Sequence, residues 1–172
     1  MIALPPGVFR YLLIGQAIIP FFINMMINFA IGALSFGGQK SVATWALDKG
    51  AVADSIGTCF FLPCITCLIA TPIVHRQMVS GVASRIPPTD VPRWVRWMQG
   101  PLMLRATKFG VTGILLLTCP VYGFYYLFAG DSIETVRFIA IKAISAGVMG
   151  VFVTPIIAFV ALCDHSASPQ PR

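Results

Sequence analysis

Lys142 is the charged residue that lies deepest within an apolar segment, in the long one near the C-terminus. A lysine ammonium in such a segment can bind an anionic solute group, couple solute movement to a gradient, or form a purely structural ion pair. Asp54 and Glu134 are its candidate partners, and the flexible lysine stem can also carry the charge several ångströms toward the membrane surface. The sequence leaves both the structural lysine and the substrate-binding or coupling lysine open.

A second polar feature is a series of residues spaced by four in the first apolar segment. Gln16, Asn24 and Asn28 follow this spacing, and Pro20 and Gly32 continue it. On a helix of 3.6 residues per turn, each step of four drifts by about 40°, so these residues form one slowly turning stripe. Three interpretations remain open: a seam where helices pack closely, a solute or water path lined by the asparagines, and a contact with another subunit.

The cysteines and histidines do not predict a metal or redox centre. Cys64 and Cys67 form a C-x-x-C beside Cys59, but they lie inside an apolar segment and have no second pair at zinc-site spacing. A second set has metal-ligand chemistry if the ends of two apolar segments meet: His75, Cys163, Asp164 and His165. We interpret these four as ordinary residues of a membrane boundary and predict no metal.

No catalytic constellation stands out either. The chain has two histidines, no carboxylate inside an apolar segment, no phosphate-binding glycine-rich loop and no G-x-S-x-G elbow. We therefore predict that the protein is not an enzyme and holds no cofactor.

Aromatic and basic residues alternate in the middle of the chain. The turn residues Pro87 to Asp90 and the pair Gly100-Pro101 bound a predicted short helix from Val91 to Gln99. On this helix Trp94 and Trp97 share a face, with two arginines beside them. Such a helix is typical of the interface between lipid headgroups and acyl chains, where we expect four residues to anchor it: Arg93, Trp94, Arg96 and Trp97.

The elements that position these residues are four segments without any charged side chain or histidine. They span residues 11–39, 55–74, 109–130 and 143–163, each about 20 residues or longer. A helix of that length measures about 30 Å, the thickness of the hydrocarbon core of a bilayer. Hydrophobic residues make up 57% of the chain, charged residues 10%, and mean hydropathy is +0.84. The sequence therefore predicts an all-α integral membrane protein and excludes a soluble bundle or a β-barrel.

We expect a single membrane domain over residues 1–172, built as a four-helix bundle of two transmembrane hairpins. The predicted spans are about 9–36, 54–76, 104–130 and 133–163, with a linker at 77–103 and a disordered tail at 166–172. In the turn before the last span, Asp131 and Glu134 have capping-box spacing, which predicts a helix start near Ser132. Thr71-Pro72-Ile73-Val74 and Thr154-Pro155-Ile156-Ile157 echo each other, so the hairpins can be a repeat whose axis runs along the membrane normal.

Charge distribution predicts the orientation. Eight basic and two acidic residues lie in residues 1–10, 76–108 and 164–172, whereas the two remaining connections carry four of each. By the positive-inside rule, both termini and the linker are cytoplasmic, with the linker near anionic lipids. We expect an inner (plasma) membrane of a bacterium as the location, and the basic pI near 9.4 does not indicate nucleic-acid binding.

The function we expect is that of an accessory or structural subunit, or a self-associating component, whose spans dock on other membrane subunits or on copies of itself. The alternative is a small oligomeric transporter or channel with a pathway built from the polar stripe and Lys142. The sequence does not identify a solute or a partner.

Overall fold

Four long helices dominate the computed structural model, which describes residues 6–84, 86 and 91–164. All four are long and apolar enough to cross a membrane, and they cover Tyr11–Phe36, Ala51–Val79, Leu102–Phe128 and Thr135–Leu162. This architecture supports the prediction of an integral membrane protein with four spans. The proposed disordered tail at 166–172 lies outside the described residues.

The first span changes helical type along its length. A short helix α1 (Pro6–Arg10) leads into a π-helical segment η1 (Tyr11–Ile18), which continues as α2 (Ile19–Phe36). The N–H of Ile19 donates to the carbonyl of Ile14, five residues earlier. Pro20 follows directly and has no N–H, and its ring prevents regular α-helical contact with the preceding turn. The turns before Pro20 are therefore π-helical and wider than those of an α-helix.

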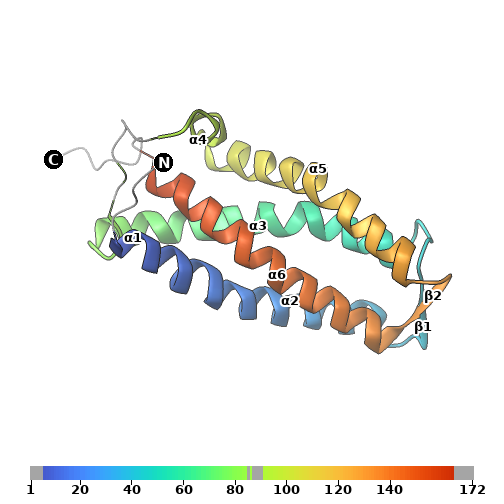
Figure 1. The fold of residues 1–172 in the computed structure, drawn as a ribbon. Coiled ribbons are helices and arrows are strands. Elements are labelled where there is room, and N and C mark those ends of the chain that lie inside the picture. The colour runs from blue at the N-terminus through green and yellow to red at the C-terminus, as the bar shows by residue number, and fades with distance from the viewer. Residues whose placement is uncertain (1–5, 85, 87–90, 165–172) are drawn as a thin grey trace.

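The other three spans are α3 (Ala51–Val79), α5 (Leu102–Phe128) and α6 (Thr135–Leu162). Extensive contacts join α2 to α6, α6 to α3, and α3 to α5, so the helices form a row in the order α2, α6, α3, α5 (Figure 1). Two self-packed hairpins would instead pair α2 with α3 and α5 with α6. The hairpins predicted from sequence describe how the chain is connected, whereas packing joins helices from different hairpins.

The row of helices has an approximately twofold pattern. Exchanging α2 with α5 and α3 with α6 converts the α2–α6 contact into the α5–α3 contact and leaves the central α3–α6 contact unchanged. Such an exchange relates helices that run in the same direction, as the repeat suggested by the two Thr-Pro-Ile segments requires. The packing is therefore compatible with a repeat axis along the membrane normal.

Two short strands join the connections at one end of the bundle. Strand β1 (Ser41–Ala43) pairs antiparallel with β2 (Ser132–Glu134), with Val42 opposite Ile133. No strand is predicted from the sequence, and the predicted capping box of Asp131 and Glu134 is wrong. Helix α6 begins at Thr135, and its N-cap residue Glu134 makes no side-chain capping bond. The backbone of Ser132 to Glu134 bonds to β1 and so cannot begin the helix. We call this end of the bundle the strand end.

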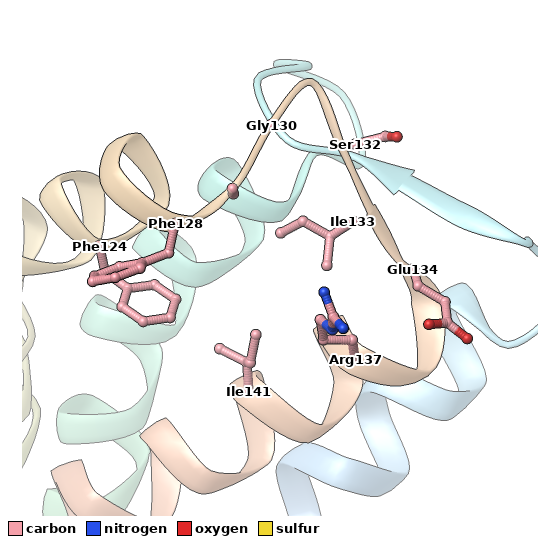
Figure 2. A pocket seen from close by; sticks show the side chains of 9 residues that line it. Phe124, Phe128, Gly130, Ser132, Ile133, Glu134, Arg137 and Ile141 are labelled. Carbon is pink, nitrogen blue, oxygen red and sulfur yellow. The ribbon is translucent and has the colours of Figure 1, made fainter.

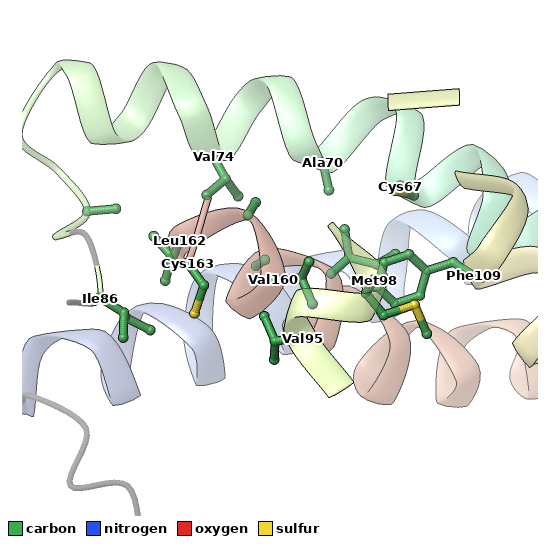
Figure 3. Packing of buried hydrophobic residues seen from close by; sticks show 14 of the residues in the cluster. Cys67, Ala70, Val74, Ile86, Val95, Met98, Phe109, Val160, Leu162 and Cys163 are labelled. Atoms are coloured by element: carbon green, nitrogen blue, oxygen red, sulfur yellow. The ribbon is translucent and has the colours of Figure 1, made fainter. Parts of the chain in front are cut away.

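At the opposite end, the short helix α4 (Arg93–Met98) covers the bundle. It is shorter than the predicted 91–99. Val95 and Met98 are buried in a large apolar cluster with residues of α3, α5 and α6, including Val74, Phe109 and Leu162 (Figure 3). A second apolar cluster lies at the strand end, where the Phe36 and Phe138 rings meet edge to face with centroids 5.0 Å apart. We call the end covered by α4 the α4 end.

Candidate functional site

Lys142 forms a buried ion pair with Asp54 near the strand end. Its Nζ lies 2.8 Å from Oδ1 and 2.6 Å from Oδ2 of the carboxylate, and the Lys142 side chain is only 4% exposed. Asp54 lies in the first turn of α3, where the helix dipole favours a negative charge. Of the two partners suggested by the sequence, the structure places Asp54 against the lysine. The pair ties α6 to α3.

Hydroxyl groups surround the ion pair. The hydroxyls of Ser55 on α3 and Tyr125 on α5 are 2.9 Å apart, and Thr58 donates to the backbone carbonyl of Asp54. A cavity of about 220 Å³ borders Lys142 and these groups. Its remaining walls come from α5 and α6 and are mainly apolar: Pro120, Val121, Phe124, Ile141, Ser145, Ala146 and Met149. An amphipathic or apolar molecule suits such walls better than a strongly hydrated ion does.

A second cavity of about 370 Å³ lies nearer the strands (Figure 2). It shares Phe124 and Ile141 with the first cavity, so the two cavities adjoin between α5 and α6. These two helices share no extensive contact, which leaves the space between them open. The pair of cavities is called the α5–α6 groove below. The strand-end cavity is also lined by Phe128, Ala129, Gly130, Ser132, Ile133, Glu134 and Arg137.

The polar stripe of the first span lies elsewhere, where α2 packs on α6. Gln16 and Asn28 are buried, and the amides of Asn24 and Asn28 donate to carbonyls one turn earlier in their own helix. A Cβ added at Gly150 of α6 would lie 2.6 Å from Asn24 Nδ2, and one at Gly32 would touch Ile139. These close contacts favour the packing-seam interpretation. Neither cavity described above is lined by a stripe residue.

Gln16 also takes part in a polar network that the sequence did not suggest. Its side-chain amide donates to Tyr11 Oη at 3.0 Å, and the Tyr11 hydroxyl donates to Gln77 Oε1 near the end of α3. Gln77 is 61 residues away from Gln16 in sequence, so only the fold brings them together. This network joins η1 to α3 at the α4 end.

A second buried ion pair lies at the α4 end, and sequence analysis missed it. Arg105 Nη2 is 2.5 Å from Asp164 Oδ2, and the two side chains are 3% and 7% exposed. His75 Nε2 lies 3.7 Å from the same carboxylate oxygen. In the sequence, Arg105 is one of the charges of residues 76–108, which are predicted to be cytoplasmic. The signal that could have placed it is the start of a span after Gly100-Pro101, which puts Arg105 in the first turn of α5.

Backbone carbonyls near this ion pair are also occupied. Gln99 Nε2 donates to the carbonyl of Cys163 at 2.8 Å, and Arg105 Nη2 donates to that of Gly100 at 3.3 Å. Lys108 Nζ donates to the carbonyl of Trp97 at 2.5 Å and stands 5.3 Å from the centre of the Trp97 ring. Because a helix leaves its last carbonyls without partners, Lys108 stabilises the end of α4.

The four candidate anchors of α4 are all exposed. The rings of Trp94 and Trp97 are 48% and 60% exposed, and Trp94 stacks on Phe159 with ring centroids 6.1 Å apart. Arg93 and Arg96 are exposed beside them. The exposed face of α4 thus combines indole rings and guanidinium groups, while its other face packs on the bundle.

The cysteines are free thiols, of which Cys59, Cys67 and Cys163 are buried. Burial raises the pKa of Cys163 to about 11, so this thiol stays protonated and weakly reactive at neutral pH. Among the described residues, no three His, Cys, Asp or Glu side chains are grouped so that they could hold a metal ion. His165, the fourth member of the set considered in the sequence, lies outside the described residues.

The chain matches no protein-family model, no curated protein and no solved structure.

Proposed function

We propose that this chain is a non-enzymatic membrane component that acts through helix association, as an accessory subunit or by self-association. The observation that supports this proposal best is the open row of helices. Helices α2 and α5 end the row, and each has one extensive helix contact, whereas α3 and α6 have two long-helix neighbours each. The most apolar window of the first span and that of α5 are each only 11% buried, against 33% and 44% for α3 and α6.

The outer face of α2 is the preferred contact surface. It exposes Ala30 and Ala33 beside large apolar side chains such as Phe29 and Leu34. Small residues allow helix backbones to approach closely in a membrane, where dispersion contacts drive association in place of the hydrophobic effect. The polar stripe lies on the opposite side of α2 and is used against α6. The stripe therefore supports the internal packing that presents this outer face.

Native mass spectrometry after mild detergent extraction tests the proposal. We expect the chain to appear with other membrane chains or with copies of itself. Ala30→Trp should dissociate this assembly, because the indole holds the facing helix away. Val148→Trp is the matched control, since Val148 is an exposed residue of the central helix α6. A wild-type chain that is found alone in mild detergent, or equal dissociation by both variants, would contradict the proposal.

We also propose that both termini and the α4 end are cytoplasmic in a bacterial inner membrane, with the exposed arginines and tryptophans of α4 near anionic lipids. The charge bias supports this orientation. Single cysteines on a cysteine-free background test it. Impermeant reagent added outside the cell should label Ser41→Cys, at the strand end, and should not label Ser84→Cys. The reverse labelling pattern would invert the orientation.

The alternative function is a small oligomeric transporter or channel, and the cavity beside Lys142 is the observation that favours it. The polar stripe and Lys142 contact different helices. Asn24 packs against α6, whereas Lys142, which belongs to α6, pairs with Asp54 of α3. Ser145→Trp, at an exposed residue that lines this cavity, separates the two functions. Intact assembly with unchanged solute flux in vesicles supports association, whereas intact assembly with altered flux supports a pathway.

A further inference from the structure

The α5–α6 groove combines a charged rim with an apolar body, and the proposed association through α2 does not use it. Arg137 and Glu134 lie at its rim next to strand β2. Phe124 and Phe128 of α5 face Ile141 of α6 across the groove (Figure 2). The adjoining cavity continues along α6 to Met149 with mainly apolar walls, which Lys142 and the hydroxyls of Ser55, Thr58, Tyr125 and Ser145 interrupt. From the charged rim inward the groove thus becomes mainly apolar, in the direction that a lipid does.

The depth of these residues matches the layers of a bilayer. Helix α6 has 28 residues and is about 42 Å long, so about 6 Å extends beyond a hydrocarbon core of about 30 Å at each end. Arg137 is the third residue of α6 and therefore lies in the headgroup layer. Ile141 and Met149 lie farther along the helix, at the depth of the acyl chains.

The rim charges are not used within the described part of the chain. No hydrogen bond or ion pair there involves the side chain of Arg137 or of Glu134, and both residues are exposed. A guanidinium group binds a phosphate with two parallel hydrogen bonds, and a carboxylate accepts hydrogen bonds from an ammonium group. One cation and one anion side by side therefore complement a headgroup that carries both charges.

We propose that the α5–α6 groove is a binding site for one phospholipid with a zwitterionic amino headgroup. Arg137 binds the phosphate, Glu134 accepts hydrogen bonds from the headgroup ammonium, and one acyl chain lies between α5 and α6 against Phe124, Ile141 and Met149. The lipid fills a space that these two helices leave open, with cavities of about 370 and 220 Å³, of which the larger is within the size range of ordinary ligand sites.

Lipid retention in nanodiscs tests this site. The full chain is placed in nanodiscs of equimolar phosphatidylethanolamine and phosphatidylglycerol, released into mild detergent, and measured by native mass spectrometry. We expect one retained phosphatidylethanolamine per wild-type chain. Arg137→Gln should lower its retention about tenfold, a loss that corresponds to about 1.4 kcal/mol. Arg76→Gln is the matched control, because Arg76 is an exposed arginine of α3 at the other end of the bundle.

Two further variants separate the headgroup from the acyl chain. Glu134→Gln should reduce the preference for phosphatidylethanolamine over phosphatidylglycerol and leave total lipid retention largely unchanged. Ile141→Trp should fill the groove and lower retention of both lipids. Both positions border the cavity, and unchanged unfolding midpoints verify that each variant is folded.

Three results would overturn the proposal. The first is equal lipid retention by wild type and Arg137→Gln, or an equal loss in Arg76→Gln. The second is a wild-type preference for phosphatidylglycerol, which would assign the rim to an anionic headgroup. The third is loss of a homodimer in Arg137→Gln without loss of lipid, which would place a second copy of the chain in the groove.

Discussion

The two ends of the bundle each hold one buried ion pair, but they are built differently. At the strand end, Lys142 and Asp54 both lie inside long helices, and a cavity borders them. At the α4 end, Asp164 lies two residues after the end of α6 and pairs with Arg105, with His75 near the same oxygen. The α4 end is also closed by a large apolar cluster that includes Val95 of the short helix (Figure 3).

This difference shows how one bundle can be tight at one end and open at the other. The ion pair at the α4 end is enclosed by α4 and by hydrogen bonds to loop carbonyls, so its loss disturbs a closed structure. The ion pair at the strand end borders a space into which water or a lipid can move. Enclosure therefore sets how strongly each pair contributes to stability, because a charge left without a partner costs most where nothing can solvate it.

The largest effect is expected from Asp164→Ala. This change leaves Arg105 buried without its carboxylate and should lower the free energy of unfolding by about 3 kcal/mol. Reversible unfolding in mixed micelles measures the change. Replacing Arg105 by leucine in the same chain should recover most of the loss, and a single variant as stable as wild type would show that the α4 end is not enclosed.

A smaller loss is expected from Asp54→Ala, about 2 kcal/mol, because the cavity beside Lys142 can admit water to the uncompensated ammonium. The same unfolding assay applies. Asp48→Ala is the matched control, since Asp48 is exposed in the connection between α2 and α3. If Asp54→Ala is more destabilising than Asp164→Ala, the proposed contrast between an open and a closed end is wrong.

Close packing between the ends is tested by Gly113→Ala in α5. The added Cβ would lie 2.3 Å from the backbone carbonyl oxygen of Cys59, so α5 must move away from α3. We expect a loss of about 1–2 kcal/mol by overpacking. Gly123→Ala in the same helix meets no atom within 4 Å and should be neutral or slightly stabilising. Equal stability of the two variants would mean that α3 and α5 are not in close contact at Gly113.

The smallest effect is expected at the surface of the α4 end. Trp97→Ala removes the ring beside Lys108 and should cost about 0.5–1 kcal/mol. Hydrogen exchange should report faster opening of α4 while the four spans keep their protection. A double-mutant cycle with Lys108→Met isolates the ring–ammonium interaction, and a coupling energy of zero would show that Trp97 acts only through its contact with lipid.

Much of the fold can be predicted from the sequence because a span needs a long segment without charge, and this requirement is local. The sequence also limits the partner of Lys142 to Asp54 or Glu134, because few acidic residues are predicted at a similar depth in the membrane. The pairing of β1 with β2 and the burial of Arg105 depend on which helices pack together. That choice is made by contacts such as Gly113 against Cys59 and Gly150 against Asn24, whose partners are distant in sequence.

The pairing of β1 with β2 has a consequence for how the chain is made. Val42 and Ile133 are about 90 residues apart, and both must be on the same side of the membrane before their strands can bond. During synthesis, the first connection therefore exists well before its partner strand does, and the edge of β1 stays unpaired until residues 132–134 have been made. A ribosome-bound chain that ends before Ser132 would lack this closure, so completion of the strand pair marks the point at which the two halves of the protein become one unit.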